Sequence, residues 1–255
     1  IGGFSVGLES TGKFKTVAFC EQDKFCQKVL HKHWPNIPIH EDIKKLDGTK
    51  IKADVIVGGF PCQSFSIAGK QKGKEDERYL WDEMFRVIKE AKSRWIIGEN
   101  VQNLINIADG QILQGIHNDL EAENFEVQTF CISAASVGAW HKRSRIWIVA
   151  ANTKCKLLHG CSSTTRNSTK KFSGLECNKS EVRGEIWSKT ERCDEQNRKQ
   201  NWWEIESKLF GVPDGLQTKS HPDRANRIKA LGNAIVPQIA TEIGKAIIKA
   251  EEENV

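Results

Sequence analysis

Two patterns of apolar and polar residues alternate along this chain. Short apolar runs rich in β-branched residues predict strands, and stretches in which apolar residues recur every three or four positions predict helices. The predicted helices lie at residues 23–33, 81–92 and about 112–123, and in a last segment that starts at Pro237. The predicted strands lie at residues 16–20, 53–57, 94–98, 125–132 and within 140–150, which begins basic and becomes apolar. Strands interleaved with helices in this way are typical of an α/β fold.

The stretch Gly58–Ser66, with the sequence GGFPCQSFS, carries the strongest local signal for chemistry. It directly follows the strand 53–57, whose end is marked by two glycines, and Pro61 fixes the backbone one residue before Cys62. Ligands of open α/β sheets bind beyond the carboxyl ends of the strands, so a cysteine here is placed for nucleophilic catalysis. The same residues also fit a small buried cysteine without a chemical role, and both interpretations stay open at this point. The polar, glycine-punctuated segment 67–78 predicts an active-site lid.

Carboxylates follow three other extended segments. Glu21 ends the strand 16–20, about 20 residues after a glycine-rich turn, which is a place for a ribose-binding carboxylate. Asp42 and Ile43 follow a short extended piece, and such a pair can hold a purine ring by its edge and its face. Glu99 follows the strand 94–98. The plain alternatives are an exposed glutamate at position 21 and a helix-capping pair formed by Glu99 and Asn100.

Two arginines precede the last apolar run of the first 150 residues. On a strand, Arg143 and Arg145 would point to the same face. Paired guanidinium groups on one face suit the recognition of carbonyl or phosphate oxygens. A charged edge strand is the alternative.

Composition and charge divide the chain. Its 255 residues suffice for one large domain, or for one domain plus a small one, and no apolar run approaches the ~20 residues of a membrane span. Eight irregularly spaced cysteines, without a signal-peptide pattern, predict a cytoplasmic protein with mostly free thiols. Residues 152–201 hold 11 Lys and Arg against 6 Asp and Glu, and this excess of 11 − 6 = +5 equals the net charge of the chain.

A localised basic excess of this kind is typical of nucleic-acid binding, with a solvated loop as the alternative. The composition also shifts at Asn152 toward Ser, Thr, Asn and Lys, which predicts a small irregular domain. We therefore expect domains at 1–151, 152–223 and 224–255, the last returning to the first. No metal is expected, because the cysteines and histidine of the middle segment match no zinc-ligand spacing: Cys155, His159, Cys161, Cys177 and Cys193.

Taken together, five motifs in order resemble the cytosine-C5 DNA methyltransferases. The resemblance covers residues 1–150 and 205–250, with His141 where the family has Gln before the arginine motif. The motifs are Ile1–Phe4 for the latter half of the glycine-rich cofactor motif, Gly58–Gln63 for the Pro-Cys motif, Glu99–Val101, Arg143–Arg145 and Gly232–Pro237. On this resemblance the chain begins inside a strand–turn–helix unit whose strand is missing.

The resemblance implies a Rossmann-like sheet of the S-adenosylmethionine-dependent methyltransferases, with helices on both faces and a small irregular target recognition domain. It implies attack of the Cys62 thiolate on C6 of a cytosine flipped out of double-stranded DNA. Glu99, protonated or sharing a proton, would hold N3 and the amino group of the base. Arg143 would hold O2, with Arg145 in support.

The resemblance also implies a binding site for S-adenosylmethionine. Its methionine part would lie near the N-terminal motif and the C-terminal motif, its ribose on the first strand-end carboxylate and its adenine on the Asp-Ile pair. The implied cofactor residues are Gly2, Gly3, Phe4, Glu21, Asp42, Ile43, Pro61, Asn233 and Ile235.

The expected partner is double-stranded DNA, bound by a monomer in a bacterial or phage-infected cell. A restriction endonuclease acting on the same site is a possible counterpart that need not bind the chain. Two alternatives stay open. A tRNA cytosine methyltransferase would share the chemistry but tends to carry a second proline where this chain has Phe60. A catalytically silent DNA-binding relative is disfavoured by the intact Cys62, Glu99 and Arg143.

Overall fold

The computed structural model describes residues 1–61, 80–156 and 224–253. Cys62, the segment expected to form a lid and nearly all of the expected recognition domain lie outside these ranges. The α-helices are α1 (Gly3–Glu9), α2 (Lys24–His33), α3 (Trp81–Ala91), α4 (Gln111–Ala122), α5 (Thr153–Lys156), α7 (Arg224–Asn233) and α8 (Pro237–Glu252). The strands are β1 (Phe19–Cys20), β2 (Ile39–His40), β3 (Val55–Gly59), β4 (Trp95–Val101), β5 (Phe125–Ile132) and β6 (Arg145–Asn152). Short 3-10 helices are η1 (Ile43–Lys45), η2 (Gly48–Lys50), η5 (Gln102–Ile105), η6 (Ile107–Gly110) and η7 (Ala134–Val137).

The described strands form two sheets. The larger sheet has the order β3-β4-β6-β5, in which β3 and β4 are parallel and β6 runs antiparallel to both of its neighbours. The smaller sheet is the parallel pair β1-β2, with Phe19 opposite Ile39 and Cys20 opposite His40. The expected α/β architecture is confirmed, as a mixed sheet rather than a purely parallel one.

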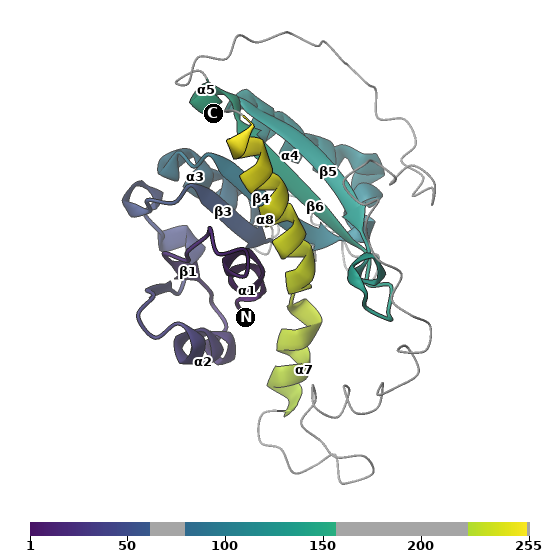
Figure 1. Ribbon diagram of the computed structural model, residues 1–255. Coiled ribbons are helices and arrows are strands. Elements are labelled where there is room, and N and C mark those ends of the chain that lie inside the picture. Colours follow the sequence, from purple (N-terminus) through teal and green to yellow (C-terminus); the bar gives the residue numbers. More distant parts are fainter. Residues whose placement is uncertain (62–79, 157–223, 254–255) are drawn as a thin grey trace.

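Helices cover both faces of the larger sheet (Figure 1). Alternate residues of β4 point to opposite sides: Ile96 packs with α3 and α4, whereas Ile97 packs with α1 and α8. On β6, Ile146 and Ile148 join the first of these cores and Trp147 joins the second. The amphipathic patterns of the helices therefore produce three layers, with the sheet in the middle.

Helices α1 and α8 pack very closely, although they lie at opposite ends of the sequence (Figure 1). A Cβ atom on Gly7 would lie only 2.2 Å from the carbonyl oxygen of Pro237, and one on Gly244 would lie 2.9 Å from Cδ2 of Leu8. Only glycine allows this approach. The C-terminal segment thus completes the same layer as the N-terminal helix.

Three sequence predictions need correction. The first strand covers Phe19–Cys20 only, and β4 continues through Glu99 to Val101, so that Glu99 lies within the strand rather than after it. The prediction that Arg143 shares a strand with Arg145 is wrong, because β6 begins at Arg145 and Arg143 has a φ of 34°. The backbone turns at Arg143 while its side chain donates to the carbonyls of Gly232 and Ala234, far along the sequence.

No helix in the described ranges has the length and apolarity needed to cross a bilayer.

Candidate active site

The carboxyl ends of β3 and β4 meet at one edge of the sheet and form the centre of the site. Gly59 is the register partner of Glu99, and a Cβ atom on Gly59 would lie 3.3 Å from Oε2 of that carboxylate. A glycine here therefore leaves room for the Glu99 side chain. Pro61 follows at the surface and leads directly to Cys62.

Asn100 holds the backbone that leads to Cys62. Its Nδ2 donates to the carbonyl oxygen of Phe60 at 3.0 Å, and its Oδ1 accepts from the amide of Val101 at 2.8 Å. The Phe60 ring is buried against Trp81, with the ring centroids 5.3 Å apart. The residue before Pro61 is thus fixed both by a buried hydrogen bond and by packing, which leaves little freedom where the cysteine segment begins.

Glu99 is a buried carboxylate with a cationic partner. Its Oε1 lies 3.2 Å from Nε of Arg145, whose side chain is 22% exposed. Burial raises the pKa of Glu99 above its ordinary value, and the charges of Arg145 and Arg143 oppose this shift without cancelling it. The site therefore favours a proton on Glu99 more than a surface carboxylate would.

Arg143 lies near this pair but uses its side chain differently. One of its terminal nitrogens, Nη2, donates to the carbonyl of Gly232 at 2.7 Å and to that of Ala234 at 2.6 Å. Burial lowers the pKa of Arg143, and Arg145 adds to the shift. Arg143 therefore braces the turn between α7 and α8, whereas Arg145 contacts Glu99.

A second group of residues lies on the same face of the sheet as Glu99. Trp147 is the register partner of Glu99 on β6, and its indole meets the ring of Phe4 edge to face at 5.8 Å between centroids. A Cβ atom on Gly3 would lie 2.8 Å from Cγ1 of Ile235. The Nε1 of Trp147 is fully buried and has no hydrogen-bond partner among the described residues.

The ends of β1 and β2 carry two more of the expected carboxylates. Glu21 Oε1 accepts from the amide of Asp23 at 2.9 Å, and Asp42 Oδ1 accepts from the amide of Lys44 in η1, also at 2.9 Å. Both carboxylates act on the thiol of Cys20, whose pKa is raised first by burial and then by Asp42 and Glu21. The structure therefore brings Glu21 and Asp42 to the same end of the small sheet.

The C-terminal segment reaches this end as well. Lys229 on α7 donates to Asp23 Oδ2 at 2.9 Å, and this hydrogen bond is the main reason why the pKa of Asp23 is lowered to about 2. Asp23 also caps α2 by accepting from the amides of Phe25 and Cys26. The turn that contains Glu21 is thus tied both to α2 and to α7.

Comparisons with known proteins decide the family. A family model described as C-5 cytosine-specific DNA methylase matches residues 1–208. The chain belongs to this family. The resemblance inferred from the five motifs is thereby confirmed.

Curated type II methyltransferases match more than half of the chain. The type II methyltransferase M1.ScrFI of Lactococcus lactis subsp. cremoris is 40% identical over 156 residues, which are 60% of this chain and 40% of that protein. M.HhaI of Haemophilus parahaemolyticus is 33% identical over 150 residues, which are 58% of this chain and 46% of that protein. The chain thus spans less than half the length of these two relatives.

Solved structures show the same fold. The S. pombe Dnmt2 methyltransferase superposes with a TM-score of 0.60 at 13% identity, covering 98% of this chain and 96% of that one. A putative DNA modification methyltransferase encoded within an E. coli prophage gives a TM-score of 0.51 at 21% identity, covering 60% of this chain and 44% of that one. The expected S-adenosylmethionine-dependent methyltransferase fold is therefore confirmed.

The methyl donor of C-5 methylases is S-adenosylmethionine, and features of this structure fit such a ligand. The buried Nε1 of Trp147, which has no partner within residues 1–61, 80–156 and 224–253, belongs to the ring beside Phe4, where the methionine part is expected. Glu21 and Asp42 gather where the ribose and adenine are expected. In the described part of the chain, no group of three or more His, Cys, Asp or Glu side chains is placed to hold a metal ion.

The structure joins most of the predicted site residues into two groups. Glu99, Arg145 and Pro61 lie at the end of the large sheet, with Gly3, Phe4 and Ile235 on the same face as Glu99, and Glu21 and Asp42 lie at the small sheet. Asn233, the last residue of α7, is exposed, and no contact with the described part of the chain assigns it a role. Sequence reasoning missed the roles of Asn100 and Trp147. The alternation of side chains along a strand gives the one available signal, because it points Asn100 to the other side of β4 from Glu99, toward the apolar core.

Proposed function

We propose that this chain transfers a methyl group from S-adenosylmethionine to C5 of a cytosine in double-stranded DNA, through a covalent adduct between Cys62 and C6. The observation that carries the proposal is the buried Glu99–Arg145 pair beside Gly59, at the point where Asn100 fixes the backbone before Cys62. Membership of the C-5 cytosine-specific DNA methylase family supports the same reaction.

The chemistry explains why these groups are needed. Addition of the Cys62 thiolate to C6 breaks the C5–C6 double bond and makes C5 nucleophilic, as negative charge moves toward N3 and O2. A protonated Glu99 would donate to N3 and so neutralise this charge as it develops. S-adenosylmethionine would supply the methyl group as an electrophile. Loss of the C5 proton to a base would then restore the double bond and expel the Cys62 thiolate.

We propose roles for the two arginines that differ from those expected from the sequence. Arg145 contacts Glu99, which supports a role for its guanidinium in donating to O2 of a base held by Glu99. Arg143 is engaged with the carbonyls of Gly232 and Ala234 and would hold the C-terminal motif against the site. We therefore assign base binding to Arg145 and a bracing role to Arg143.

The cofactor would lie along the face formed by the N-terminal motif and the C-terminal turn. We place its methionine part near Gly2, Gly3 and Phe4 with Asn233 and Ile235, and its sulfonium near Pro61. Its ribose would bind Glu21, and its adenine would bind Asp42 and Ile43. Two observations support this placement: the buried Nε1 of Trp147 has no partner in the described part of the chain, and Glu21 and Asp42 lie at the same end of the small sheet.

The remaining proposals concern the substrate and its setting. The target base would be flipped out of the duplex, since C5 and C6 are inaccessible in a stacked base pair. Residues 152–223 would form the target recognition domain, for which their basic composition is the support. We expect a monomer that acts on cytoplasmic DNA, with or without an endonuclease for the same site.

Labelled methyl transfer tests the proposal. The full chain, Cys62→Ser and the matched thiol variant Cys131→Ser are incubated with methyl-tritiated S-adenosylmethionine and either duplex DNA of mixed sequence or a tRNA pool. We expect label at C5 of cytosine in the duplex with the wild type and Cys131→Ser, and none with Cys62→Ser. Label in tRNA alone would contradict the assigned substrate, and label that persists with Cys62→Ser would contradict the mechanism.

A further inference from the structure

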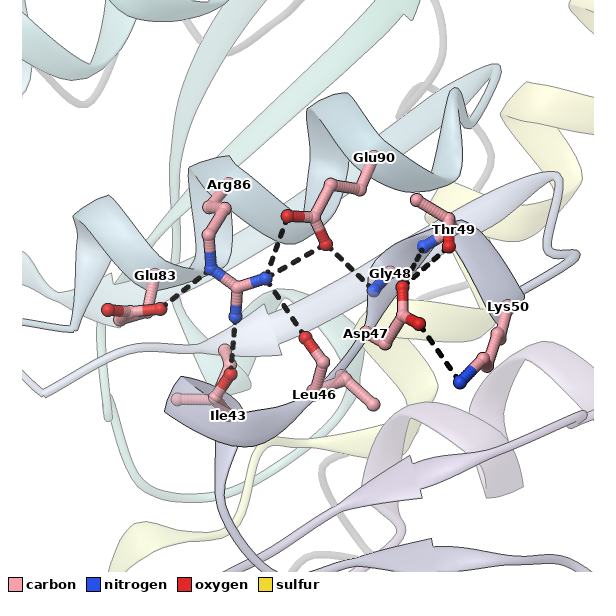
Figure 2. A network of polar contacts seen from close by, with 9 residues as sticks. All are labelled: Ile43, Leu46, Asp47, Gly48, Thr49, Lys50, Glu83, Arg86 and Glu90. Carbon is pink, nitrogen blue, oxygen red and sulfur yellow. Dashed lines mark hydrogen bonds and ion pairs between the residues drawn. The ribbon is translucent and has the colours of Figure 1, made fainter.

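The guanidinium of Arg86, on α3, makes contacts in two directions (Figure 2). Toward its own helix, Nε donates to Glu83 Oε2 at 2.9 Å and Nη1 donates to the two carboxylate oxygens of Glu90 at 2.8 and 2.9 Å. Toward the segment after β2, Nη1 donates to the carbonyl of Leu46 at 2.9 Å and Nη2 to that of Ile43 at 2.7 Å. Hydrogen bonds to Glu90 and Glu83 raise the pKa of Arg86 and hold its planar fork in one orientation.

The two carbonyls that Arg86 binds lie at the two ends of η1. This single turn begins after Asp42, which caps it, and ends at Lys45, with Leu46 as its C-cap. The Leu46 carbonyl lies beyond the end of the turn, and the Ile43 carbonyl already accepts from the amide of Leu46 at 3.2 Å. A side-chain donor from another element adds a hydrogen bond to each of these carbonyls and so stabilises the turn. Arg86 supplies that donor from α3, across some 40 residues of sequence.

Glu90 extends the same contact to the next turn. Its Oε2 accepts from the amide of Gly48 at 2.8 Å, at the start of η2. A Cβ atom on Gly48 would lie 2.8 Å from Cβ of Glu90, so the backbone of η2 lies directly against α3. Glu90 therefore both orients Arg86 and binds the segment that Arg86 holds (Figure 2).

The first turns of α3 contact the strand that leads to the cysteine. Trp81 packs on Phe60, and the sulfur of Met84 lies 2.9 Å from the position of a Cβ atom on Gly58. One rigid helix thus touches both the end of β3 and the turn that begins at Asp42. The position of that turn relative to the reacting groups depends on α3.

Resting on the proposed function, we propose that Arg86 is a positioning residue for the adenine half of S-adenosylmethionine. It holds the turn of Asp42 and Ile43 at a fixed place against α3, and it would touch neither the cofactor nor the cytosine. Losing it would let this turn move while the groups around Glu99 stay in place. The affinity for the cofactor should then fall more than the rate of the chemical step.

Kinetics of Arg86→Met and Arg86→Lys test this separation in the full chain. We expect Arg86→Met to raise KM for S-adenosylmethionine and Kd for S-adenosylhomocysteine about tenfold, with kcat changed less than about twofold. For Arg86→Lys, KM and Kd should lie between those of the wild type and Arg86→Met, because an ammonium group cannot bond two carbonyls and two carboxylates at once. Lys245→Met is the matched control and should behave as wild type, since among the described residues Lys245 pairs only with Glu242, also on α8, at 2.7 Å.

Amide hydrogen exchange gives a readout that does not depend on activity. Residues 43–50 should exchange faster in both Arg86 variants, while α8 should exchange as in the wild type. If a folded Arg86 variant shows unchanged exchange in residues 43–50, or an unchanged KM for S-adenosylmethionine, this inference is overturned and the proposed function is not. If Arg86→Met does not fold, the same two measurements on Arg86→Lys test the inference. A wild-type chain that neither binds nor uses S-adenosylmethionine would instead overturn the proposed function and this inference with it.

Discussion

The hydrogen bond from Asn100 to Phe60 allows a quantitative prediction. Asn100→Ala removes the Nδ2 donor that lies 3.0 Å from the Phe60 carbonyl oxygen. That oxygen then lacks this hydrogen bond, and Phe60 is only 7% exposed. An unsatisfied buried acceptor costs about 1–3 kcal/mol. The amide of Val101 also loses its acceptor, but Val101 is 43% exposed, so water can replace that bond. We therefore expect a loss of about 1–3 kcal/mol in the free energy of unfolding.

Activity should fall further than stability suggests, because the same bond fixes the backbone before Cys62. A displacement of about 1 Å in a reacting group can reduce the rate on the order of 10²-fold. Urea unfolding would measure the stability, and single-turnover methyl transfer at saturating cofactor would measure the rate. Asn100→Asp keeps the shape of the side chain but replaces the amide donor with a carboxylate oxygen, which also adds a charge, so it removes the hydrogen bond without the cavity left by alanine.

Asn118→Ala is the matched control for this prediction. Asn118 accepts an exposed hydrogen bond from Gln114 within α4, and its loss should change the free energy of unfolding by less than about 0.5 kcal/mol. The reasoning is refuted if Asn100→Ala and Asn100→Asp lose no more stability than this control. It is also refuted if both variants keep the wild-type rate.

Three further predictions test the site and its packing. Burial raises the pKa of Glu99 above 4.5, so ionised Glu99 destabilises the fold as pH rises through that raised value. Glu99→Gln should therefore gain stability relative to wild type as pH rises from 4.5, and the difference should stay constant below 4.5, as measured by urea unfolding at several pH values. Gly59→Ala, whose methyl group would lie 3.3 Å from Glu99, should reduce methyl transfer at least about tenfold while changing stability by less than about 1 kcal/mol. Gly7→Ala, which meets the Pro237 carbonyl at 2.2 Å, should destabilise the fold by about 1–3 kcal/mol, whereas Gly115→Ala, with open space around it, should not.

Each of these predictions has an outcome that contradicts it. A stability difference for Glu99→Gln that is the same at every pH would show that the pKa of Glu99 is not raised. Full activity in Gly59→Ala would show that the space beside Glu99 is not needed. Equal melting temperatures for Gly7→Ala and Gly115→Ala would contradict the close packing of α1 on α8.

Local patterns along the sequence were sufficient to predict the strands that carry the site. The apolar runs located β3, β4, β5 and β6, because a buried strand needs apolar residues whatever its neighbours are. Glu99 was recognised as a carboxylate at the end of such a run. The order of the motifs then gave the family and the expected sheet.

What the sequence did not predict depends on contacts between distant residues. Arg143 leaves the strand conformation while bonding to carbonyls 89 and 91 residues further along the chain, and no local pattern reports such a contact. We propose base binding for Arg145 rather than Arg143 for the same reason, since only the structure brings Arg145 to Glu99. Arg86 likewise has the sequence signature of an ordinary i,i+4 helix pair with Glu90. Its contacts with the turn after Asp42 become visible only once α3 is packed.

Covalent trapping on DNA containing 5-fluorocytosine tests the central claim most directly. Fluorine cannot leave C5 as a proton does, so the enzyme should stay attached to the base through Cys62 after methyl transfer. With S-adenosylmethionine we predict a denaturation-resistant complex between the full chain and duplex DNA, formed equally by Cys131→Ser and absent with Cys62→Ser. A complex that forms with Cys62→Ser, or methyl transfer to cytosine without any trapped complex on the fluorinated duplex, would contradict the account.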